Sequence, residues 1–290
     1  MNIFFELLAS GIALGAVYAA IALGFVLVFK AASILNFAQG DFVMLAIYLA
    51  LASLVGWGLP WPLGIAFVLA AMTLLGVLVH YTVARPLIGR PFFSLVLATI
   101  GVGMMIRAAI ILFYGVREQP PLRILPTGLF RVGDVAISVS DIWTLVIVLI
   151  TVAAFAAFFN LTRLGLNMRA VADNLEAANI VGIDTDRVFR LAWIICMIVC
   201  AIGGVLYANF TSSIDLSVSH VGLFAIPAAI IGGVTSIPGA VVGLLLGVLE
   251  QVGAGYMGAE WRDIFAFGTL FIVLMLRPRG LFGRAEVERV

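Results

Sequence analysis

Apolar stretches about as long as a bilayer is thick recur along the whole chain. A helix that crosses a bilayer needs about 20 predominantly apolar residues, because the hydrocarbon core is about 30 Å thick. Hydropathy marks the following candidate spans: 5–29, 38–57, 61–83, 92–113, 141–160, 191–210, 220–235, 237–254 and 261–276. The seventh is short and contains Pro227, so it is either a crossing or a broken, re-entrant segment. The sequence therefore predicts an all-α, polytopic transmembrane bundle of eight or nine spans, forming a single domain over residues 1–290.

Composition leaves little room for a water-soluble domain. Apolar residues make up 64% of the 290 residues and charged residues only 11%, and the mean hydropathy is +1.22. Soluble domains contain about 45–50% apolar and about 25% charged residues. A soluble globular enzyme, a disordered chain and a nucleic-acid-binding protein are therefore excluded, and the lipid bilayer is the predicted surrounding.

The sequence motifs of membrane-associated enzymes are missing. The single lysine, Lys30, is not preceded by glycine, so the G-x-x-x-x-G-K-[ST] nucleotide-binding loop cannot form. His80 and His220 lie far apart without an H-E-x-x-H motif, and there is no G-x-S-x-G elbow. Cys196 and Cys200 are one helical turn apart in an apolar stretch, where small core residues are the expected role. We expect no catalytic residue, no metal site and no cofactor bound by this chain.

The distribution of basic residues predicts the orientation in the membrane, because loops rich in Lys and Arg stay in the cytoplasm. With nine spans and a cytoplasmic C-terminus, eleven basic residues lie inside, four lie outside, and Arg107 falls within a span. The reverse orientation violates the rule. The N-terminus is therefore predicted outside and the C-terminus inside.

The outer connection, 114–140, is long enough to have a structure of its own. It contains the proline pair Pro120-Pro121 and then alternating apolar residues around Gly133-Asp134. Such alternation around a Gly-Asp pair is typical of a small β-hairpin. An irregular loop is the alternative.

The inner connection, 161–190, is predicted to contain a short amphipathic helix over Leu166–Val181. Its apolar side chains recur at three- or four-residue spacing on one face: Met168, Val171, Leu175 and Ala178. Gly182 follows as the residue that ends the helix. A helix that lies on lipid is expected to be rich in Lys and Arg, whereas this polar face has mixed charge. A partner protein is therefore favoured over the bilayer surface as the support for this helix.

Glycine recurs at four-residue spacing in two of the predicted spans. Gly11 and Gly15 lie in the first, and Gly239, Gly243 and Gly247 lie in the eighth. This spacing lets helix backbones approach closely in a membrane, where no hydrophobic effect drives helices together. Packing within the chain and contact with a second membrane subunit are both open interpretations.

Two stretches, 36–41 and 226–239, interrupt the apolar pattern with polar residues and backbone breakers. Non-helical backbone persists at membrane depth only where protein or a water-filled path satisfies its polar groups. Paired broken segments also point to a transport path. The candidate path residues are Asn36, Gln39, Pro227 and Gly232. For 36–41, a helix end at the cytoplasmic surface is an equally good interpretation.

Three blocks of sequence resemble the high-affinity branched-chain amino acid ABC permeases, and the first block favours the LivH-type subunit. The first block is Gly11-x-x-x-Gly15-x-x-Tyr18-Ala-x-x-Ala-Leu-Gly24, followed by Asn36-Phe-Ala-Gln-Gly40. The second is Arg169-Ala-Val-Ala-Asp-Asn-x-Glu-Ala-Ala-x-x-x-Gly182-Ile. The third is Gly232-Gly-Val-Thr-Ser-Ile-Pro-Gly-Ala-Val-Val-Gly243. Together they extend the resemblance over nearly the whole chain.

The resemblance implies a permease subunit of a binding-protein-dependent importer in the bacterial inner membrane. Its implied partners are a homologous second permease, two cytoplasmic ATPase subunits that hydrolyse ATP, and a periplasmic substrate-binding protein. The implied substrates are branched-chain or other hydrophobic amino acids, or related small molecules such as amides, urea and aromatic acids. The outer connection would receive the loaded binding protein.

The second block also resembles the EAA loop by which importers dock on their ATPases, although no Ile-x-Leu-Pro follows downstream. We therefore carry over the docking role and not the detailed geometry. The resemblance implies these ATPase-coupling residues: Met168, Arg169, Val171, Asp173, Leu175, Glu176, Ala177, Ala178 and Gly182. Met168, Val171 and Leu175 are expected to form the seated apolar face. Arg169, Asp173 and Glu176 are expected to make the polar contacts.

An ion-coupled secondary transporter of small organic solutes is the alternative. It would need a carboxylate in the middle of a span, because polar groups at that depth are costly and serve ion pathways. The polar residues at span depth or at span ends are Glu6, Arg107, Asn209, Asp215, Glu250 and Gln251. Most lie near predicted span ends, and no carboxylate stands clearly at a span centre, which favours the permease.

Overall fold

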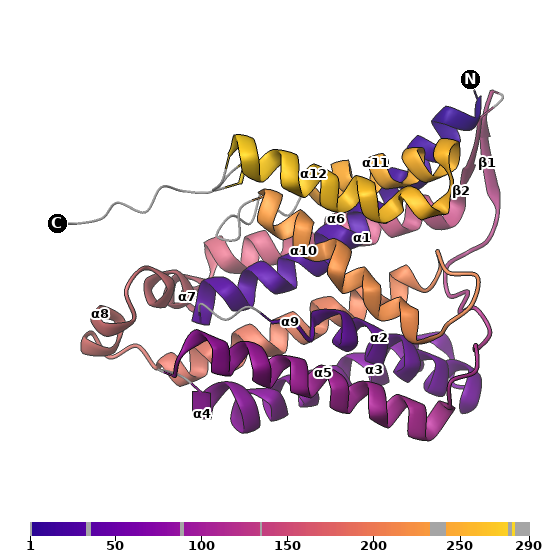
Figure 1. Ribbon diagram of the computed structural model, residues 1–290. Coiled ribbons are helices and arrows are strands. Elements are labelled where there is room, and N and C mark those ends of the chain that lie inside the picture. Colours follow the sequence, from indigo (N-terminus) through magenta and orange to yellow (C-terminus); the bar gives the residue numbers. More distant parts are fainter. Residues whose placement is uncertain are drawn as a thin grey trace.

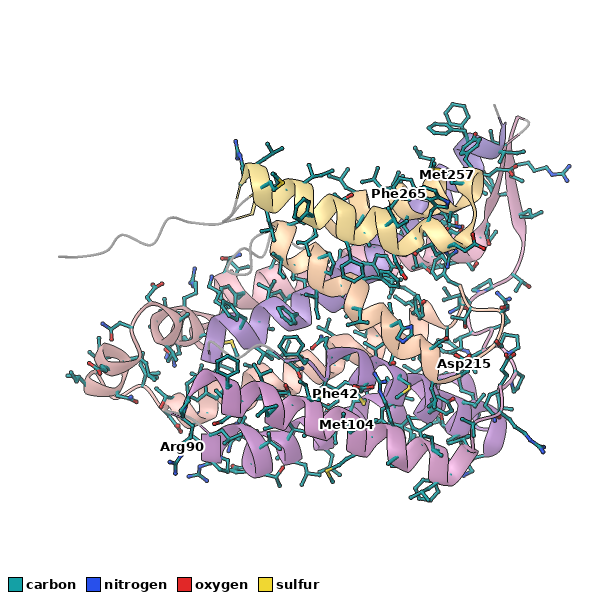
Figure 2. The ribbon with its side chains drawn as sticks, in the orientation of Figure 1. Phe42, Arg90, Met104, Asp215, Met257 and Phe265 are labelled. Atoms are coloured by element: carbon teal, nitrogen blue, oxygen red, sulfur yellow. The ribbon has the colours of Figure 1, made fainter. Side chains whose placement is uncertain are left out.

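The structure, a computed structural model, describes residues 2–32, 36–87, 90–133, 135–232, 242–277 and 280–281. The helices run mostly lengthwise along one bundle (Figure 1). The N-terminus and a short hairpin lie at one end, called here the hairpin end, and α7 and α8 project from the other, the α7–α8 end. Figure 2 places Met257 towards the hairpin end and Arg90 towards the α7–α8 end.

The elements follow one another in this order: α1 (Asn2–Ala32), α2 (Gln39–Leu51), α3 (Trp61–Val79), α4 (Arg85–Leu87), α5 (Phe92–Tyr114), β1 (Leu129–Val132), β2 (Val135–Ser138), α6 (Val139–Leu161), α7 (Arg163–Asp173), α8 (Leu175–Ile180), α9 (Thr185–Tyr207), α10 (Val221–Gly232), α11 (Val242–Met257) and α12 (Arg262–Leu276). π-Helical turns continue α2 over Ala52–Gly56 and α3 over His80–Ala84. A 3₁₀ turn, Leu216–His220, leads into α10, and another, Ala259–Trp261, leads into α12. The all-α prediction is confirmed.

In the described part of the chain, six helices are long and apolar enough to cross a membrane. They include α1, α2 and α3 with their π-helical continuations, α5, α6 and α9. Two shorter apolar helices follow, Leu216–Gly232 and Val242–Met257. Pro227 lies inside α10. The count of eight or nine crossings stays a prediction.

The first helix is the centre of the bundle. α1 contacts α6, α9, α10 and α11 along its length, and most of its side chains are buried. The peripheral helices α3, α5 and α6 instead expose large apolar side chains over their outer faces. This distribution, with a buried apolar centre and mostly apolar outer faces, suits a bundle in a membrane, because lipid solvates apolar side chains.

Close packing of α1 against α11 explains the four-residue glycine spacing. A Cβ atom on Gly15 would lie 2.6 Å from the Leu244 Cα, and one on Gly247 would overlap the backbone of Gly15. Gly11 and Gly243 approach the facing helix in the same way. These four glycines therefore serve packing within the chain. Residues 233–241, which hold Gly239 and most of the third sequence block, lie outside the described residues.

The connection between α5 and α6 contains the expected hairpin. β1 and β2 pair antiparallel, with Leu129 opposite Ser138 and Val132 opposite Val135. The Glu6 Oε1 accepts a hydrogen bond from the Ala136 backbone N–H at 3.1 Å, which ties the hairpin to the start of α1. The hairpin prediction is confirmed and the irregular loop is excluded.

Candidate functional site

The segment between α6 and α9 consists of two short helices, so the prediction of one helix over Leu166–Val181 is wrong. The break is Asn174, whose backbone is extended at φ −159° and ψ 106°. Its Oδ1 accepts a hydrogen bond from the Ala177 N–H at 2.9 Å and caps α8. Asparagine favours such caps because its side chain competes for backbone hydrogen bonds.

The end of this segment is as predicted. Gly182 adopts a left-handed φ of +83°, and its N–H donates to the Asn179 carbonyl at 3.1 Å. Glycine takes this conformation without the steric cost that a Cβ atom brings. The Asp184 side chain then accepts from the Arg187 N–H at 3.0 Å and caps α9. The segment therefore joins α9 without a long flexible linker.

The predicted apolar face of the segment is mostly covered by the chain itself. Met168 and Val171 are buried in the same apolar cluster as Phe155 and Phe159 of α6. The Arg169 guanidinium lies 5.9 Å from the centre of the Phe159 ring. Ala178 is also buried. The three α7 residues hold that helix against α6, so the surface left exposed differs from the predicted face.

The surface that remains free combines apolar and acidic side chains. Ile180 is 86% exposed and Val181 is 73% exposed. We define the α7–α8 surface as Leu166, Asp173, Leu175, Glu176, Ala177, Ile180 and Val181, all exposed. Large apolar side chains on a projecting segment indicate a binding surface, because water solvates them poorly.

A rigid joint connects the α7–α8 segment to α6. The Thr162 Oγ1 accepts from the Gly165 N–H at 3.0 Å and donates to the Phe158 carbonyl at 2.6 Å. A Cβ atom on Gly165 would lie 2.6 Å from that same carbonyl oxygen. The close approach of the chain at this turn thus requires glycine at position 165.

A buried polar cluster lies where α2 begins. The Gln39 Nε2 donates to the Ile21 carbonyl and to the Cys200 Sγ, both at 3.1 Å. Its Oε1 accepts from the Asn36 Nδ2 at 2.9 Å and from the Cys196 Sγ at 3.4 Å. Every side chain in this cluster is buried. The carboxamide of Gln39 therefore joins α1, α2 and α9 through its full set of polar atoms.

The depth of this cluster argues against a helix end at the membrane surface. Ile21 lies eleven residues from the end of α1, and Cys196 lies eleven residues from the start of α9. At about 1.5 Å per residue both positions are more than about 15 Å inside their helices. Asn36 and Gln39 thus lie in the interior of the bundle, where α2 starts (Figure 1).

The structure does not bring all four candidate path residues together. Pro227 and Gly232 are buried in α10. The contact between α2 and α10 is made at their starts instead, where a Cβ atom on Gly222 would overlap the backbone of Gly40. Among the described residues, no recorded hydrogen bond joins Asn36 or Gln39 to Pro227 or Gly232.

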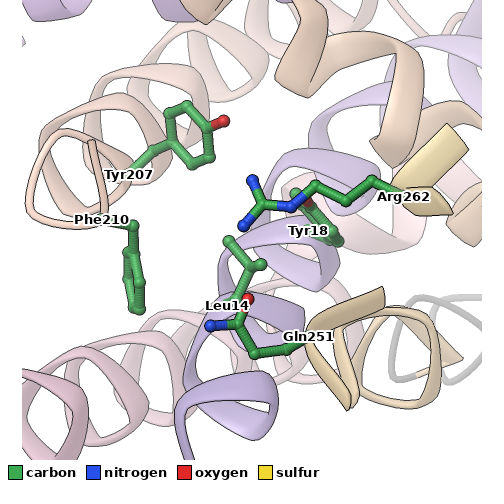
Figure 3. A pocket seen from close by; sticks show the side chains of 6 residues that line it. All are labelled: Leu14, Tyr18, Tyr207, Phe210, Gln251 and Arg262. Atoms are coloured by element: carbon green, nitrogen blue, oxygen red, sulfur yellow. The ribbon is translucent and has the colours of Figure 1, made fainter. Parts of the chain in front are cut away.

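Sequence reasoning missed a second polar site, near the hairpin end. Glu250 is buried in the middle of α11, and the Arg262 Nε lies 3.8 Å from its Oε1. The Glu250 Oε2 is buried without a hydrogen-bond partner in the described part of the chain. Beside this pair lies a cavity of about 60 Å³ (Figure 3). Its lining residues are Leu14, Tyr18, Tyr207, Phe210, Gln251 and Arg262.

The comparison with known families agrees with this architecture. The model of a family described as "Branched-chain amino acid transport system / permease component" matches residues 7–274. The chain belongs to this permease family. The match includes α2–α11 and most of α1 and α12, so it covers both the α7–α8 segment and the buried cluster at Gln39.

Individual relatives of this permease are similar over nearly the whole chain or over about half of it. The permease protein BraD of a high-affinity branched-chain amino acid transport system in Pseudomonas aeruginosa is 32% identical, over 99% of this chain and 98% of its own. The LivH permease of Escherichia coli K12 is 30% identical over the same shares. The autoinducer 2 import permease LsrC of Photorhabdus luminescens is 29% identical, over 51% of this chain and 46% of its own. No solved structure matches the permease.

Proposed function

We propose that this permease is the membrane-spanning subunit of a binding-protein-dependent ABC importer for branched-chain or other hydrophobic amino acids. Its proposed partners are a homologous second permease, two cytoplasmic ATPases that hydrolyse ATP, and a periplasmic binding protein. The proposed orientation places the α7–α8 end in the cytoplasm and the hairpin end in the periplasm of a bacterial inner membrane. The α7–α8 surface carries this proposal, because it projects from the bundle and combines apolar and acidic side chains.

The proposed coupling step is mechanical. The ATPases close on ATP, and the α7–α8 surface, seated on one of them, moves with it. The joint at Gly165 passes this displacement to α6, and the cap at Asp184 passes it to α9. α9 carries Cys196 and Cys200, which hold Gln39 at the start of α2. Motion of α9 would thus shift the buried cluster and change which end of the bundle is open.

The proposed substrate class follows from the relatives and not from a residue of this chain. BraD and LivH are named as branched-chain amino acid permeases, and both match this chain over nearly its whole length. Amides, urea and aromatic acids remain candidates, because selectivity in such an importer would lie largely in the binding protein.

An ion-coupled carrier is the second candidate, because the carboxylate that it requires is present after all. Glu250, which hydropathy placed among polar residues that lie mostly near span ends, is buried mid-helix. Its pairing with Arg262 supports a structural role, since a neighbouring cation stabilises the ionised form. The ABC importer is preferred because a carrier has no need of the projecting α7–α8 surface.

One uptake experiment separates the two candidates. The permease is purified with the second permease, the ATPases and the binding protein encoded beside it, and reconstituted into proteoliposomes. We expect uptake of labelled L-leucine that requires ATP and a catalytically intact ATPase. Uptake driven by a proton or sodium gradient, and retained with a Walker-motif-inactivated ATPase, would contradict the importer.

A further inference from the structure

An ion pair joins α2 and α5 deep in the bundle. The Arg107 Nε donates to the Asp41 Oδ1 at 2.6 Å, and the Asp41 side chain is largely buried. The other carboxylate oxygen of Asp41 lies against Gly103, where a Cβ atom would overlap it. Gly103 therefore makes room for the carboxylate on the surface of α5. Asp41 itself lies in the first turn of α2, two residues after Gln39.

The guanidinium of Arg107 is held away from the nearer end of α5. Arg107 lies seven residues before the end of α5 at Tyr114, which is about 10 Å along the helix axis. A long basic side chain can snorkel from such a position towards the nearer surface. Here Asp41, which lies against Gly103 one turn deeper, holds the guanidinium in the opposite direction. The charge is thus fixed towards the middle of the bundle.

The side chain of Arg107 is nevertheless 47% exposed. Within the described chain its only recorded hydrogen bond uses Nε, so its Nη donors have no recorded partner there. Met104, one turn away on α5, is 66% exposed (Figure 2). A guanidinium inside a spanning helix is costly against lipid, so exposed donors there indicate contact with water or another polar group.

We propose that Arg107 lines the water-filled translocation path and binds the carboxylate of the amino acid as it passes. Arginine suits this role because its planar donors bind a carboxylate in bidentate geometry. Asp41 is the positioning residue: it fixes the guanidinium through Nε and leaves the Nη donors free for the substrate. Its negative charge also weakens the net attraction, so the substrate is held briefly and released. This inference rests on the proposed function, because it takes a carboxylate-bearing substrate.

The first test is water access, measured without disturbing the ion pair. Met104→Cys is compared with Ile150→Cys on α6, which is 63% exposed at the middle of its helix with no charge beside it. Cys196 and Cys200 are buried and give little background. In the assembled complex, the membrane-impermeant reagent MTSET should modify Met104→Cys and spare Ile150→Cys. If MTSET modified neither the Met104→Cys nor the Ile150→Cys variant to a measurable extent, the proposal would be overturned.

The second test is transport of labelled L-leucine by the reconstituted complex. Arg107→Met is combined with Asp41→Asn, because the single change would strand a buried carboxylate. We expect uptake to fall at least about tenfold while the ATPase is still stimulated by the loaded binding protein, since a charge-assisted hydrogen bond is lost. Arg90→Met, at an exposed arginine between α4 and α5, is the matched control and should transport normally.

The outcomes separate this proposal from the proposed function. Absence of ATP-driven leucine uptake in the unmodified complex would contradict the proposed function. Normal uptake by the Asp41→Asn, Arg107→Met variant would overturn only the role of Arg107. Loss of the second permease during purification of that variant would show that Arg107 pairs with a carboxylate of the partner. That result would also overturn the role of Arg107 in the path. Partial recovery of uptake in Arg107→Lys, which keeps the charge, is expected.

Discussion

Gly182→Trp should reduce uptake by the reconstituted complex at least about tenfold, while the protein still inserts into the membrane at normal levels. The left-handed φ of +83° costs a residue with a Cβ atom about 1–2 kcal/mol. The space around Gly182 is open, so the indole would project beside the α7–α8 surface and obstruct its partner. Uptake is measured with labelled L-leucine, and insertion with membrane fractions.

The matched control for this change is Gly58→Trp. Gly58 also has a positive φ, +64°, and open space around it, but it precedes α3 away from the α7–α8 segment. It should leave uptake nearly unchanged. Glu176→Arg, which reverses an exposed charge on the α7–α8 surface, should also impair uptake. Normal uptake in both Gly182→Trp and Glu176→Arg would count against docking through this surface.

Gly247→Leu should prevent the accumulation of folded permease. A Cβ atom at this position would overlap the backbone of Gly15, and backbone cannot rotate away as a side chain can. Overpacking in a core ordinarily costs about 1–3 kcal/mol, and separating α1 from α11 would also remove their other contacts. The yield of monodisperse protein in detergent, measured by size-exclusion chromatography, should fall to a small fraction of normal.

Gly268→Leu serves as the control for that substitution. Gly268 lies within α12, and nothing approaches its Cβ position within 4 Å. It adds the same side chain to a helix and should give a nearly normal yield. Equal yields for Gly247→Leu and Gly268→Leu would show that α1 and α11 do not pack as described.

Hydropathy located the helices well because every segment that crosses the lipid needs about 20 mostly apolar residues. The predicted span 92–113 corresponds to α5 (Phe92–Tyr114), and 141–160 corresponds to α6 (Val139–Leu161). The depth at which a helix begins within the bundle was not predictable from hydropathy. Nothing in the apolar pattern shows that α2 begins beside the middle of α1 and α9, because that depends on how the helices pack.

The α7–α8 segment shows what the spacing of apolar residues cannot predict. Spacing at three and four residues indicated an apolar face, but not which surface covers it. Met168 and Val171 pack against α6, and only a tertiary structure reveals this. The break at Asn174 had a usable signal, since asparagine inside a predicted helix favours a cap.

Sequence analysis missed the buried polar pairs because each residue, taken alone, could be explained by a position near the end of a span or by packing in a core. Glu250 falls four residues from the end of the predicted span 237–254, whereas α11 continues to Met257 and makes it a mid-helix residue. Gln39 and Cys200 are 161 residues apart in sequence, so nothing local links them. A charge inside a hydrophobic stretch, as at Arg107, was the available signal.

The proposed contact between the α7–α8 surface and an ATPase can be tested by site-specific photocrosslinking. Benzoylphenylalanine replaces Ile180, which is 86% exposed, and in a second variant replaces Phe130 on the hairpin. After irradiation of the assembled complex, Ile180 should give an adduct with an ATPase subunit and Phe130 should give none. An Ile180 adduct with lipid alone, or an ATPase adduct from Phe130, would contradict the proposed docking and its orientation.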